Sequence, residues 1–361
     1  MSARLSTPIC ALFGIRYPIV QTGMGWVSDP GLTAATAEAG GLGILAAATL
    51  STPELAAAIR ETRRRTDAPF GVNLRADAPD AAARVALLIR ERVRVASFAL
   101  APKRDLIARL KDAGIAVLPS VGARRHAEKV ASWGADALLV QGCEGGGHTG
   151  QVPTSLLVPQ VVDAVDVPVI AAGGYFDGRG LVSALAYGAA GIAMGTRFLL
   201  TSDSPVGAAV KARYLAAGVT DTVVTDALDG VPQRVLRTPF VEALGGRGRM
   251  RRLVGGLRAG AGLRRVTGAR WRDLAREGLA MRRSRGLRAT QVLLAANTPM
   301  LLRAAMVDNR PELGVMATGQ VAGLIEDLPS CAELIERIVA EAEAVLDRLA
   351  RPILDAPGDR R

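Results

Sequence analysis

The chain has 361 residues, of which 49% are hydrophobic, so it is not an intrinsically disordered protein and has room for one large domain and a smaller one. Its three cysteines, Cys10, Cys143 and Cys331, are far apart and odd in number, which argues against a disulfide framework or a zinc site. No basic region followed by an apolar core opens the chain, so we expect a cytoplasmic protein without a secretory signal. The net charge of +11 would attract polyanions or phosphate-bearing ligands.

Short apolar runs rich in β-branched residues recur along the first two hundred residues and predict eight strands. Several end in glycine or in an amide side chain, which is typical of strands that lead into functional loops. The predicted strands are residues 18–21, 41–47, 70–74, 93–100, 115–121, 137–142, 167–174 and 191–196.

Segments with helical periodicity separate these runs, and several open with Ser, Thr, Asp or Pro. Strand followed by helix, repeated eight times, predicts an α/β fold of the (β/α)8 TIM barrel type; an open doubly wound sheet is the main alternative. The apolar stretch 181–200 is long enough to cross a membrane, but it contains Arg197 and fits the next helix and strand. The predicted helices are residues 53–65, 80–92, 103–113, 123–133, 156–165 and 178–187.

Three glycines, Gly114, Gly134 and Gly188, follow predicted helices and lead into the next strand within a few residues. Such short connections form the stable face of a barrel. The loops that leave the strands are then expected at the opposite, functional rim.

After residue 196 the pattern changes, with a predicted helix over 203–218 and short β-like pieces over 222–237. We predict a barrel over residues 1–240, a helical lid domain over 241–315 and a C-terminal return to the barrel with a frayed tail over 316–361. Fourteen arginines lie between Arg247 and Arg288, opposed only by Asp273 and Glu277. This cluster could bind nucleic acid or the phosphates of a large substrate such as coenzyme A, although its one aromatic residue gives no stacking platform.

Two neighbouring loops predict a phosphate site, because many barrels bind phosphate after their last two strands. Backbone N–H groups of Gly173, Gly174 and Gly195, with the hydroxyl of Thr196, could surround an oxyanion, and Tyr175 lies in the same stretch. The alternative is that these glycines only relieve crowding at the strand ends.

The first strand ends in Gln21-Thr22-Gly23-Met24, which could lie along a flat ring because glycine permits close approach and methionine is polarizable. Asn73 and Gln141 could supply amide groups to the same heterocycle, although single buried amides are more often structural.

The stretch 141–150 combines five glycines with one imidazole directly after an apolar run. His148 is one of two histidines, and we predict that it is the proton-transfer residue, although it could merely cap a turn. His126 is expected at the surface of a helix. Cys143 has no visible charge partner and is interpreted as a packing residue.

Gly41 to Ala46 match the pattern G-x-G-x-x-A of dinucleotide-binding proteins. The required context is a strand, a tight turn and a helix. Here the glycines precede and begin an apolar run, so the match is discounted.

Taken together, these motifs resemble the FMN-dependent (β/α)8 enzymes grouped as nitronate monooxygenases or 2-nitropropane dioxygenase-like proteins, which include a flavin-type enoyl-thioester reductase. The resemblance rests on the segments 18–24, 39–43, 71–73, 140–150, 171–174 and 194–196. Residues 21–27, 95–103, 173–180, 195–204 and 295–302 are more similar to the flavin-dependent acyl-CoA dehydrogenases of bacterial steroid C/D-ring (cholesterol) degradation, which use NAD. One departure is Gly145, where the family commonly has alanine.

The resemblance implies FMN held at the ring by Gln21, Thr22, Gly23, Met24, Asn73 and Gln141, with its phosphate on Gly173, Gly174, Tyr175, Gly195 and Thr196. It implies that His148 is the catalytic histidine, that the substrate is a CoA thioester and that NAD accepts the electrons. No metal, nucleic acid or membrane partner is expected, and a homo-oligomer is possible. The alternatives are nitronate oxidation with O2, enoyl-thioester reduction, or a nucleic-acid-binding barrel that has lost catalysis.

Overall fold

A computed structural model describes residues 3–245 and 301–351 of the chain. It divides into two compact units. The barrel unit comprises Met1–Cys143, Gln151–Ser204 and Asp327–Arg361, and the second unit comprises Glu144–Gly150 and Pro205–Glu326. The arginine cluster between residues 247 and 288 lies outside the described residues, as does most of the predicted lid. Both therefore stay predictions.

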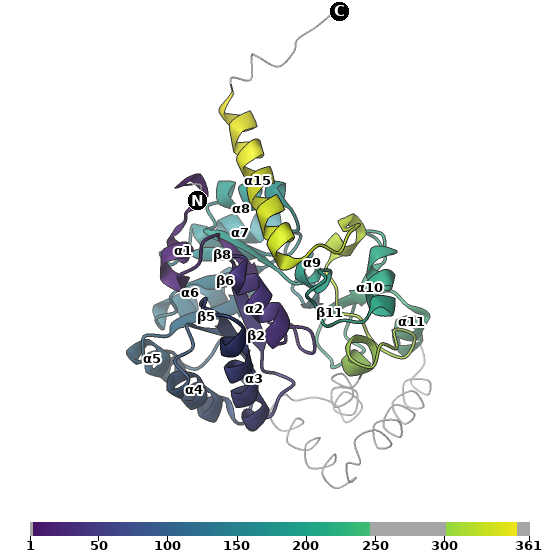
Figure 1. Cartoon of the computed structure of the whole chain (residues 1–361), viewed down its shortest axis with the longest axis horizontal. Helices are drawn as coiled ribbons and strands as arrows, with labels where there is room; N and C mark the ends of the chain where they lie inside the picture. Colours follow the sequence, from purple (N-terminus) through teal and green to yellow (C-terminus); the bar gives the residue numbers. More distant parts are fainter. Residues whose placement is uncertain (1–2, 246–300, 352–361) are drawn as a thin grey trace, which may run out of the picture. The chain divides into compact units, whose positions relative to one another are not determined.

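Eight parallel strands close into a barrel in the order β1-β2-β3-β4-β5-β6-β8-β9, with β9 pairing back onto β1 (Figure 1). The (β/α)8 prediction is confirmed, and the open doubly wound sheet is excluded because no barrel strand is left at an edge. Each strand lies within its predicted range: β1 Ile19–Gln21, β2 Leu42–Ala46, β3 Gly71–Leu74, β4 Val95–Phe98, β5 Ala116–Val121, β6 Leu138–Gln141, β8 Val169–Ala172 and β9 Gly191–Met194.

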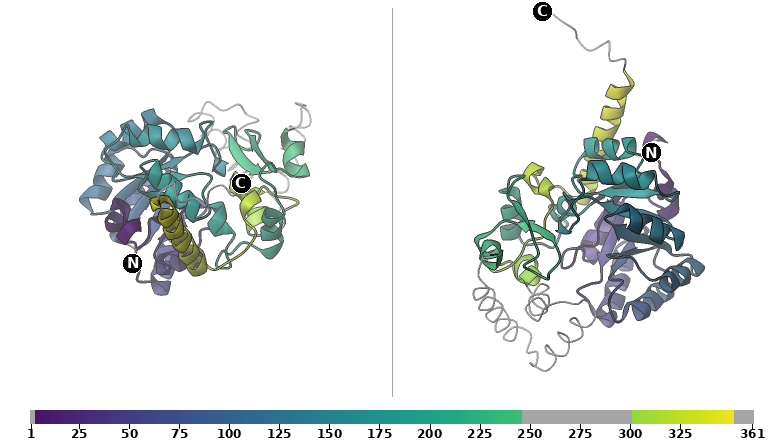
Figure 2. Two further views of the ribbon diagram at one scale, coloured as in Figure 1. Left: turned by 90° about the horizontal axis from the view of Figure 1, so that it is seen from above. Right: turned by 180° about the vertical axis from the view of Figure 1, so that it is seen from behind.

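Helices surround the strands of the barrel unit (Figure 2). The six predicted helices are confirmed, each within a turn of its expected limits, whereas η1, α1, α2 and the short α9 were not predicted. The helices of this unit are η1 Ala3–Leu5, α1 Pro8–Phe13, α2 Pro30–Glu38, α3 Thr52–Arg65, α4 Ala81–Arg90, α5 Arg104–Asp112, α6 Arg124–Ser132, α7 Thr154–Val162, α8 Gly178–Ala186, α9 Thr196–Leu199 and α15 Cys331–Ala350.

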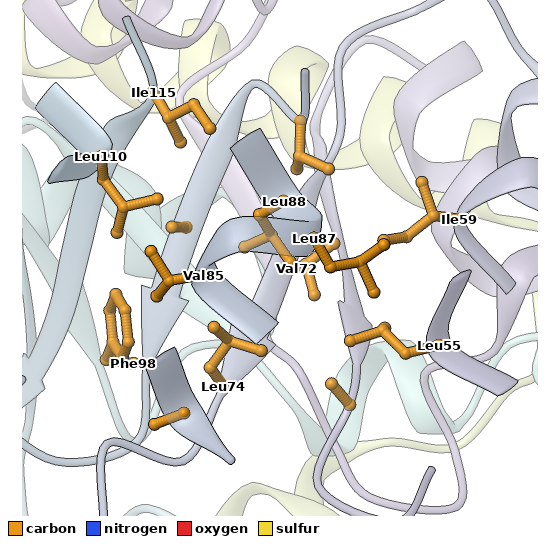
Figure 3. Close-up of a cluster of buried hydrophobic side chains, with 14 of the residues drawn as sticks. Leu55, Ile59, Val72, Leu74, Val85, Leu87, Leu88, Phe98, Leu110 and Ile115 are labelled. Carbon is orange, nitrogen blue, oxygen red and sulfur yellow. The ribbon is translucent and has the colours of Figure 1, made fainter. Parts of the chain in front are cut away.

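The barrel wall is held by side chains that alternate between its two faces. Val72 and Leu74 of β3 belong to an outer cluster with Leu55 of α3 and Val85 and Leu88 of α4 (Figure 3). Each fully buried side chain of this size contributes about 1.5–3 kcal/mol of transfer free energy. The residue between them, Asn73, is therefore placed on the inner face of the barrel.

The connections from helix to strand have the predicted geometry. Gly114, Gly134 and Gly188 all have left-handed φ angles, between 72° and 97°. After α5 the Gly114 N–H donates to Lys111 and the next N–H donates to Leu110, which satisfies the last carbonyls of the helix. The predicted short connections with a glycine after the helix are confirmed at these three positions.

Gly43 explains why a dinucleotide-like pattern occurs in a strand. It lies inside β2, where a Cβ atom would stand 2.0 Å from the carbonyl oxygen of Thr33 in α2. The glycine therefore allows helix and strand to approach closely, and discounting the dinucleotide motif was right.

The long C-terminal helix α15 begins with a capping box, in which Ser330 and Glu333 bond each other's backbone N–H groups. It packs against α8 and α2. The fit to α8 is close, because a Cβ atom on Gly178 would lie 2.4 Å from the backbone nitrogen of Ala342. The helix thus completes the outer layer of the barrel.

The second unit is built on a three-stranded antiparallel sheet, in the order β10-β11-β7. Leu228, Val235, Val241 and Val315 form its core. None of the described helices is long and apolar enough to cross a membrane. The remaining elements are β7 Gly147–His148, α10 Ala208–Leu215, β10 Thr222–Thr225, β11 Gln233–Leu236, α11 Pro239–Gly245 and η2 Gln320–Leu324.

Candidate active site

Strand register places most of the predicted binding residues at one rim of the barrel. Gln141 pairs with Ala172, the last residue of β8, and Gln21 pairs with Met194, the last residue of β9. The carboxyl ends of β6, β8, β9 and β1 therefore follow one another around the rim. This is the end of a (β/α)8 barrel at which active sites are found.

The side chain of Gln21 is fully buried and serves the barrel wall. Its Oε1 accepts from the N–H of Ile44 at 3.2 Å, and its Nε2 donates to the carbonyl of Ile44 at 3.3 Å. Backbone pairing between β1 and β2 ends at Gln21 and Gly43, and the side-chain amide of Gln21 continues it to the next residue of β2, Ile44. Its predicted contact with a ring has to come from the backbone, because the side chain is engaged by the protein.

A hydroxyl at Ser28 holds the loop that follows β1. Its Oγ accepts from Nε2 of Gln21 and from the N–H of Met24, both at 2.8 Å, and it donates to the carbonyl of Thr22 at 2.9 Å. Ser28 is buried. The bonds to Met24 and Thr22 fix the backbone of these two residues although the loop has no regular secondary structure.

Gly23 in the same loop lies against β3. A Cβ atom at this position would stand 2.4 Å from Cβ of Asn73, so only glycine lets the loop pass. Asn73 is nearly buried, and its Nδ2 donates to Oγ of Ser97 in β4 at 3.2 Å. Loop 22–24 and Asn73 thus form one contiguous surface on the rim.

Three backbone N–H groups at the ends of β8 and β9 could bind an anion. Those of Gly173, Gly174 and Gly195 donate no hydrogen bond within the parts of the chain that the structure describes. Gly173 and Gly174 both have left-handed φ angles, 94° and 86°, and the carbonyl of Gly173 is held by Thr154 at 3.0 Å. N–H groups that have no acceptor in the described chain can donate hydrogen bonds to a bound oxyanion.

The neighbouring residues shape this anion site. Thr196 and Tyr175 are buried beside the glycines. A Cβ atom on Gly195 would lie 3.2 Å from Oγ1 of Thr22 and 3.3 Å from Sδ of Met24. The loops after β9 and β1 therefore touch, which joins the predicted anion site to the predicted ring surface.

His148 belongs to the second unit, where it is one of the two residues of strand β7. Gln233 of β11 pairs with His148, Arg234 pairs with Gly147, and the N–H of Thr149 continues the pairing to Pro232 at 3.2 Å. The sequence predicted an open loop here. Pairing with β11, some 85 positions later, makes the segment a strand.

A carboxylate that the sequence analysis missed holds the imidazole. Nε2 of His148 donates to Oδ2 of Asp229 at 2.8 Å. Burial tends to raise the pKa of Asp229, but the hydrogen bond and charge of His148 and the N–H of Val231 outweigh it, so this pKa lies below its usual value. The carboxylate therefore stays ionised beside the imidazole.

The second histidine and the three cysteines have no predicted role in this arrangement. His126 is exposed on α6, as expected, and among the described residues Cys10, Cys143 and Cys331 form no disulfide bond. Among the described residues no group of three or more His, Cys, Asp or Glu could hold a metal ion. Ser28 and Asp229 are the residues that sequence reasoning missed. An Asp-Gly turn signal at 229–230 was visible, but nothing linked it to His148.

Comparison with known proteins shows the family to which the chain belongs. The model of the nitronate monooxygenase family matches residues 6–86 and 81–341. Two relatives are named (3aS,4S,5R,7aS)-5-hydroxy-7a-methyl-1-oxo-octahydro-1H-indene-4-carboxyl-CoA dehydrogenase. The one from Mycobacterium tuberculosis is 62% identical over 94% of this chain and 96% of its own length, and the one from Rhodococcus jostii is 58% identical over 96% and 98%.

Among solved structures, FabK from Thermotoga maritima is similar over 95% of this chain and 98% of its own, with a TM-score of 0.78 and 36% sequence identity. The matched segments include the whole barrel. The chain therefore belongs to the nitronate monooxygenase family and is an oxidoreductase.

Proposed function

We propose that this protein is an FMN-dependent, NAD-linked acyl-CoA dehydrogenase whose substrate is the hydroxy-methyl-oxo-octahydroindene-carboxyl-CoA thioester of steroid C/D-ring catabolism. The observation that carries the proposal is the 62% and 58% identity to two dehydrogenases named for that substrate, in each case over nearly the whole of both chains.

The barrel rim fits FMN. Gly173, Gly174 and Gly195 offer N–H groups of the kind that bind a phosphate monoester, and Thr196 lies beside them. The adjoining surface of Thr22, Gly23, Met24 and Asn73 is tightly fixed by Ser28 and by the close contact at Gly23. Such a preorganised surface suits a rigid planar ring.

In the proposed reaction a C–H bond next to the thioester and one on the adjacent carbon are broken, and a C=C bond forms between them. FMN, when bound, supplies the two-electron acceptor for the hydride that leaves the β carbon. His148 accepts the α proton, which the thioester makes more acidic. Because Asp229 accepts from Nε2–H, proton uptake by the imidazole takes place at Nδ1.

NAD is the proposed final electron acceptor. The arginine-rich stretch 247–288 is the proposed binding site of the CoA phosphates. The charge of that stretch supports the second role, since fourteen cations are far more than a small nitroalkane needs. Neither a membrane nor nucleic acid has a part in the reaction, and a homo-oligomer remains compatible with it.

Nitronate oxidation is the second candidate, because the family model carries that name. The two functions are separated by supplying the purified FMN-loaded protein with either substrate. We expect NADH to form with the indene-carboxyl-CoA thioester and NAD, and oxygen uptake with an alkyl nitronate to be slow. Rapid oxygen uptake with nitronate and no NADH from the thioester would reverse the assignment.

A further inference from the structure

We propose that Asp229 is the positioning residue of His148: it holds the imidazole in one tautomer and orientation and stabilises the imidazolium formed when a proton is taken up. The inference rests on the proposed function of His148 as the base. It assigns a role to a residue that no sequence motif singles out.

Both partners are mounted on the same small sheet. His148 is fixed by the pairing of β7 with β11, opposite Gln233. Asp229 lies in the connection between β10 and β11, directly after Leu228, which is buried in the core of the second unit. The 2.8 Å bond therefore joins two positions whose backbones are set by one sheet and one core.

The connection is shaped so that the carboxylate faces back toward the sheet. Gly230 has a left-handed φ of 82°, and its N–H donates to the carbonyl of Asp226 at 2.9 Å. The chain can then reverse, and the N–H of Val231 donates to Oδ1 of Asp229 at 3.1 Å. One carboxylate oxygen is thus held by the backbone and the other by the imidazole, so the carboxylate cannot rotate freely.

The two side chains of this pair differ in exposure. The Asp229 side chain is 11% exposed, whereas that of His148 is 54% exposed. Here the buried acid anchors the ring and leaves it accessible, as a proton-transfer residue requires.

The chemistry of the pair follows from its charges. A carboxylate accepting from Nε2–H favours the neutral tautomer that carries its proton there, so the basic lone pair is on Nδ1. When Nδ1 takes up a proton, the ring becomes a cation beside a fixed anion. The attraction is larger in the protonated state than before it, which lowers the barrier to proton abstraction.

The test uses the full-length FMN-loaded protein carrying Asp229→Asn, which keeps the shape of the side chain and removes its charge. A general base supplies about 10²- to 10⁴-fold, and we expect the substitution to lose a part of it, roughly 10- to 100-fold in kcat, with KM for the thioester and bound FMN unchanged. Asp226→Asn is the matched control, since Asp226 is exposed in the same connection. It should behave as the wild type.

A double substitution separates positioning from a general structural role. If Asp229 acts through His148, adding Asp229→Asn to His148→Gln causes no further loss of kcat, because the group it positions is already absent. A further loss of tenfold in the double variant would overturn the proposal.

The tautomer itself can be read without any substrate. The chain has two histidines, so His126→Gln leaves His148 as the single source of imidazole ¹⁵N signals. We expect the Nε2–H tautomer in the wild-type background and a shift toward the other tautomer with Asp229→Asn. An unchanged tautomer together with an unchanged kcat contradicts the role of Asp229. Failure of the wild type to oxidise the thioester would instead contradict the proposed function.

Discussion

Ser28 supplies a single hydroxyl that holds the loop proposed to carry the cofactor. Ser28→Ala leaves the N–H of Met24 without its partner at a partly buried position, at a cost of about 1–3 kcal/mol. Because the backbone of Thr22 and Met24 then loses one hydrogen bond each, we expect FMN affinity to fall about tenfold, which is about 1.4 kcal/mol. Denaturant unfolding and FMN titration measure the two effects.

The control for Ser28 is Ser132→Ala, which removes a hydroxyl that bonds only the carbonyl of Lys129 at the end of α6. FMN affinity should be unaffected there. Equal FMN binding by the wild type and Ser28→Ala would show that the loop after β1 is fixed by other contacts.

Leu100 has the backbone conformation least suited to its side chain. Its φ is 138°, and its side chain is 54% exposed in the loop that leaves β4 at the functional rim. Non-glycine residues in such regions cost about 1–3 kcal/mol and persist mainly at functional positions. We therefore expect the isobutyl group to contact the apolar rings of the substrate.

Leu100→Gly should raise the free energy of unfolding by about 1 kcal/mol, since relief of strain exceeds the added chain entropy. It should also raise KM for the thioester while FMN affinity stays the same. Leu100→Ala keeps the strain and removes the side chain, so it should raise KM without gaining stability. A lower stability for Leu100→Gly would show that the conformation is not strained.

The roles of individual residues were predicted unevenly from the sequence, for physical reasons. His148 could be selected because only two histidines exist, and the glycines because they end predicted strands. Asp229 could not, since its hydrogen bond to His148 spans 81 positions. Gln21 lies at the rim as predicted. Its amide, however, bonds the backbone of β2, and the sequence alone cannot distinguish such an amide from one that binds a ring.

At the level of elements, Gly142 determines where α7 begins. A Cβ atom there would stand 2.0 Å from Oγ1 of Thr154 and 2.5 Å from its backbone nitrogen. Gly142→Ala must displace backbone atoms, and overpacking of this kind costs about 1–3 kcal/mol. Thermal or denaturant unfolding should show that loss.

Gly122→Ala is the matched change, after β5 on the same rim, where the nearest atom would be 3.9 Å away. Its stability should stay equal or rise by up to about 1 kcal/mol, because the unfolded chain loses entropy. Similar losses at Gly142 and Gly122 would mean that close packing is not what requires glycine after β6.

Asp327 ties α9 to α15 through two arginines. Its carboxylate bonds Arg337 at 2.6 Å and the buried guanidinium of Arg197 at 2.9 Å. The hydrogen bond from Arg337, and then that from Arg197, lower the pKa of Asp327 against the opposing effect of burial. A carboxyl whose pKa is lowered by folding stabilises the protein fully above its unfolded value, about 3.9, and loses this contribution as pH falls through the folded value.

We therefore expect Asp327→Asn to reduce the free energy of unfolding at neutral pH, by only about 1 kcal/mol because the carboxylate is half exposed. The difference from wild type should begin to shrink as pH falls below about 3.9 and disappear once pH is below the lowered pKa of Asp327 in the folded protein. Denaturant unfolding at a series of pH values measures it. A difference that does not shrink as the pH is lowered from about 4 would show that the charge of Asp327 is not what matters.

Strands were easier to predict than some helices. The eight barrel strands are mostly apolar and buried, as expected when both faces of a parallel sheet are covered. Helix α2 was missed because Leu32, Thr33 and Ala34 give it no clear polar face: it packs against β2, α3 and α15 at once. Asp29 and Pro30 are a typical helix start, but a start signal without helical periodicity after it does not predict a helix.

At the scale of the whole molecule, fold and substrate follow from different kinds of information. The alternation of elements is enough for the barrel, since parallel strands joined by helices have few ways to close. An anion site and a held imidazole follow from local geometry. The CoA thioester does not, because no described contact is specific for it, and its assignment comes from the likeness to named dehydrogenases.

The most direct measurement is an anaerobic titration of the FMN-loaded protein with the indene-carboxyl-CoA thioester, followed by visible absorbance and by analysis of the thioester. We predict that the absorbance of oxidised flavin disappears as an equal amount of the α,β-unsaturated thioester forms. His148→Gln should keep its colour and react about 10²- to 10⁴-fold more slowly. A yellow wild-type protein that the thioester leaves unreduced, or a protein that binds no flavin, would contradict the proposed function.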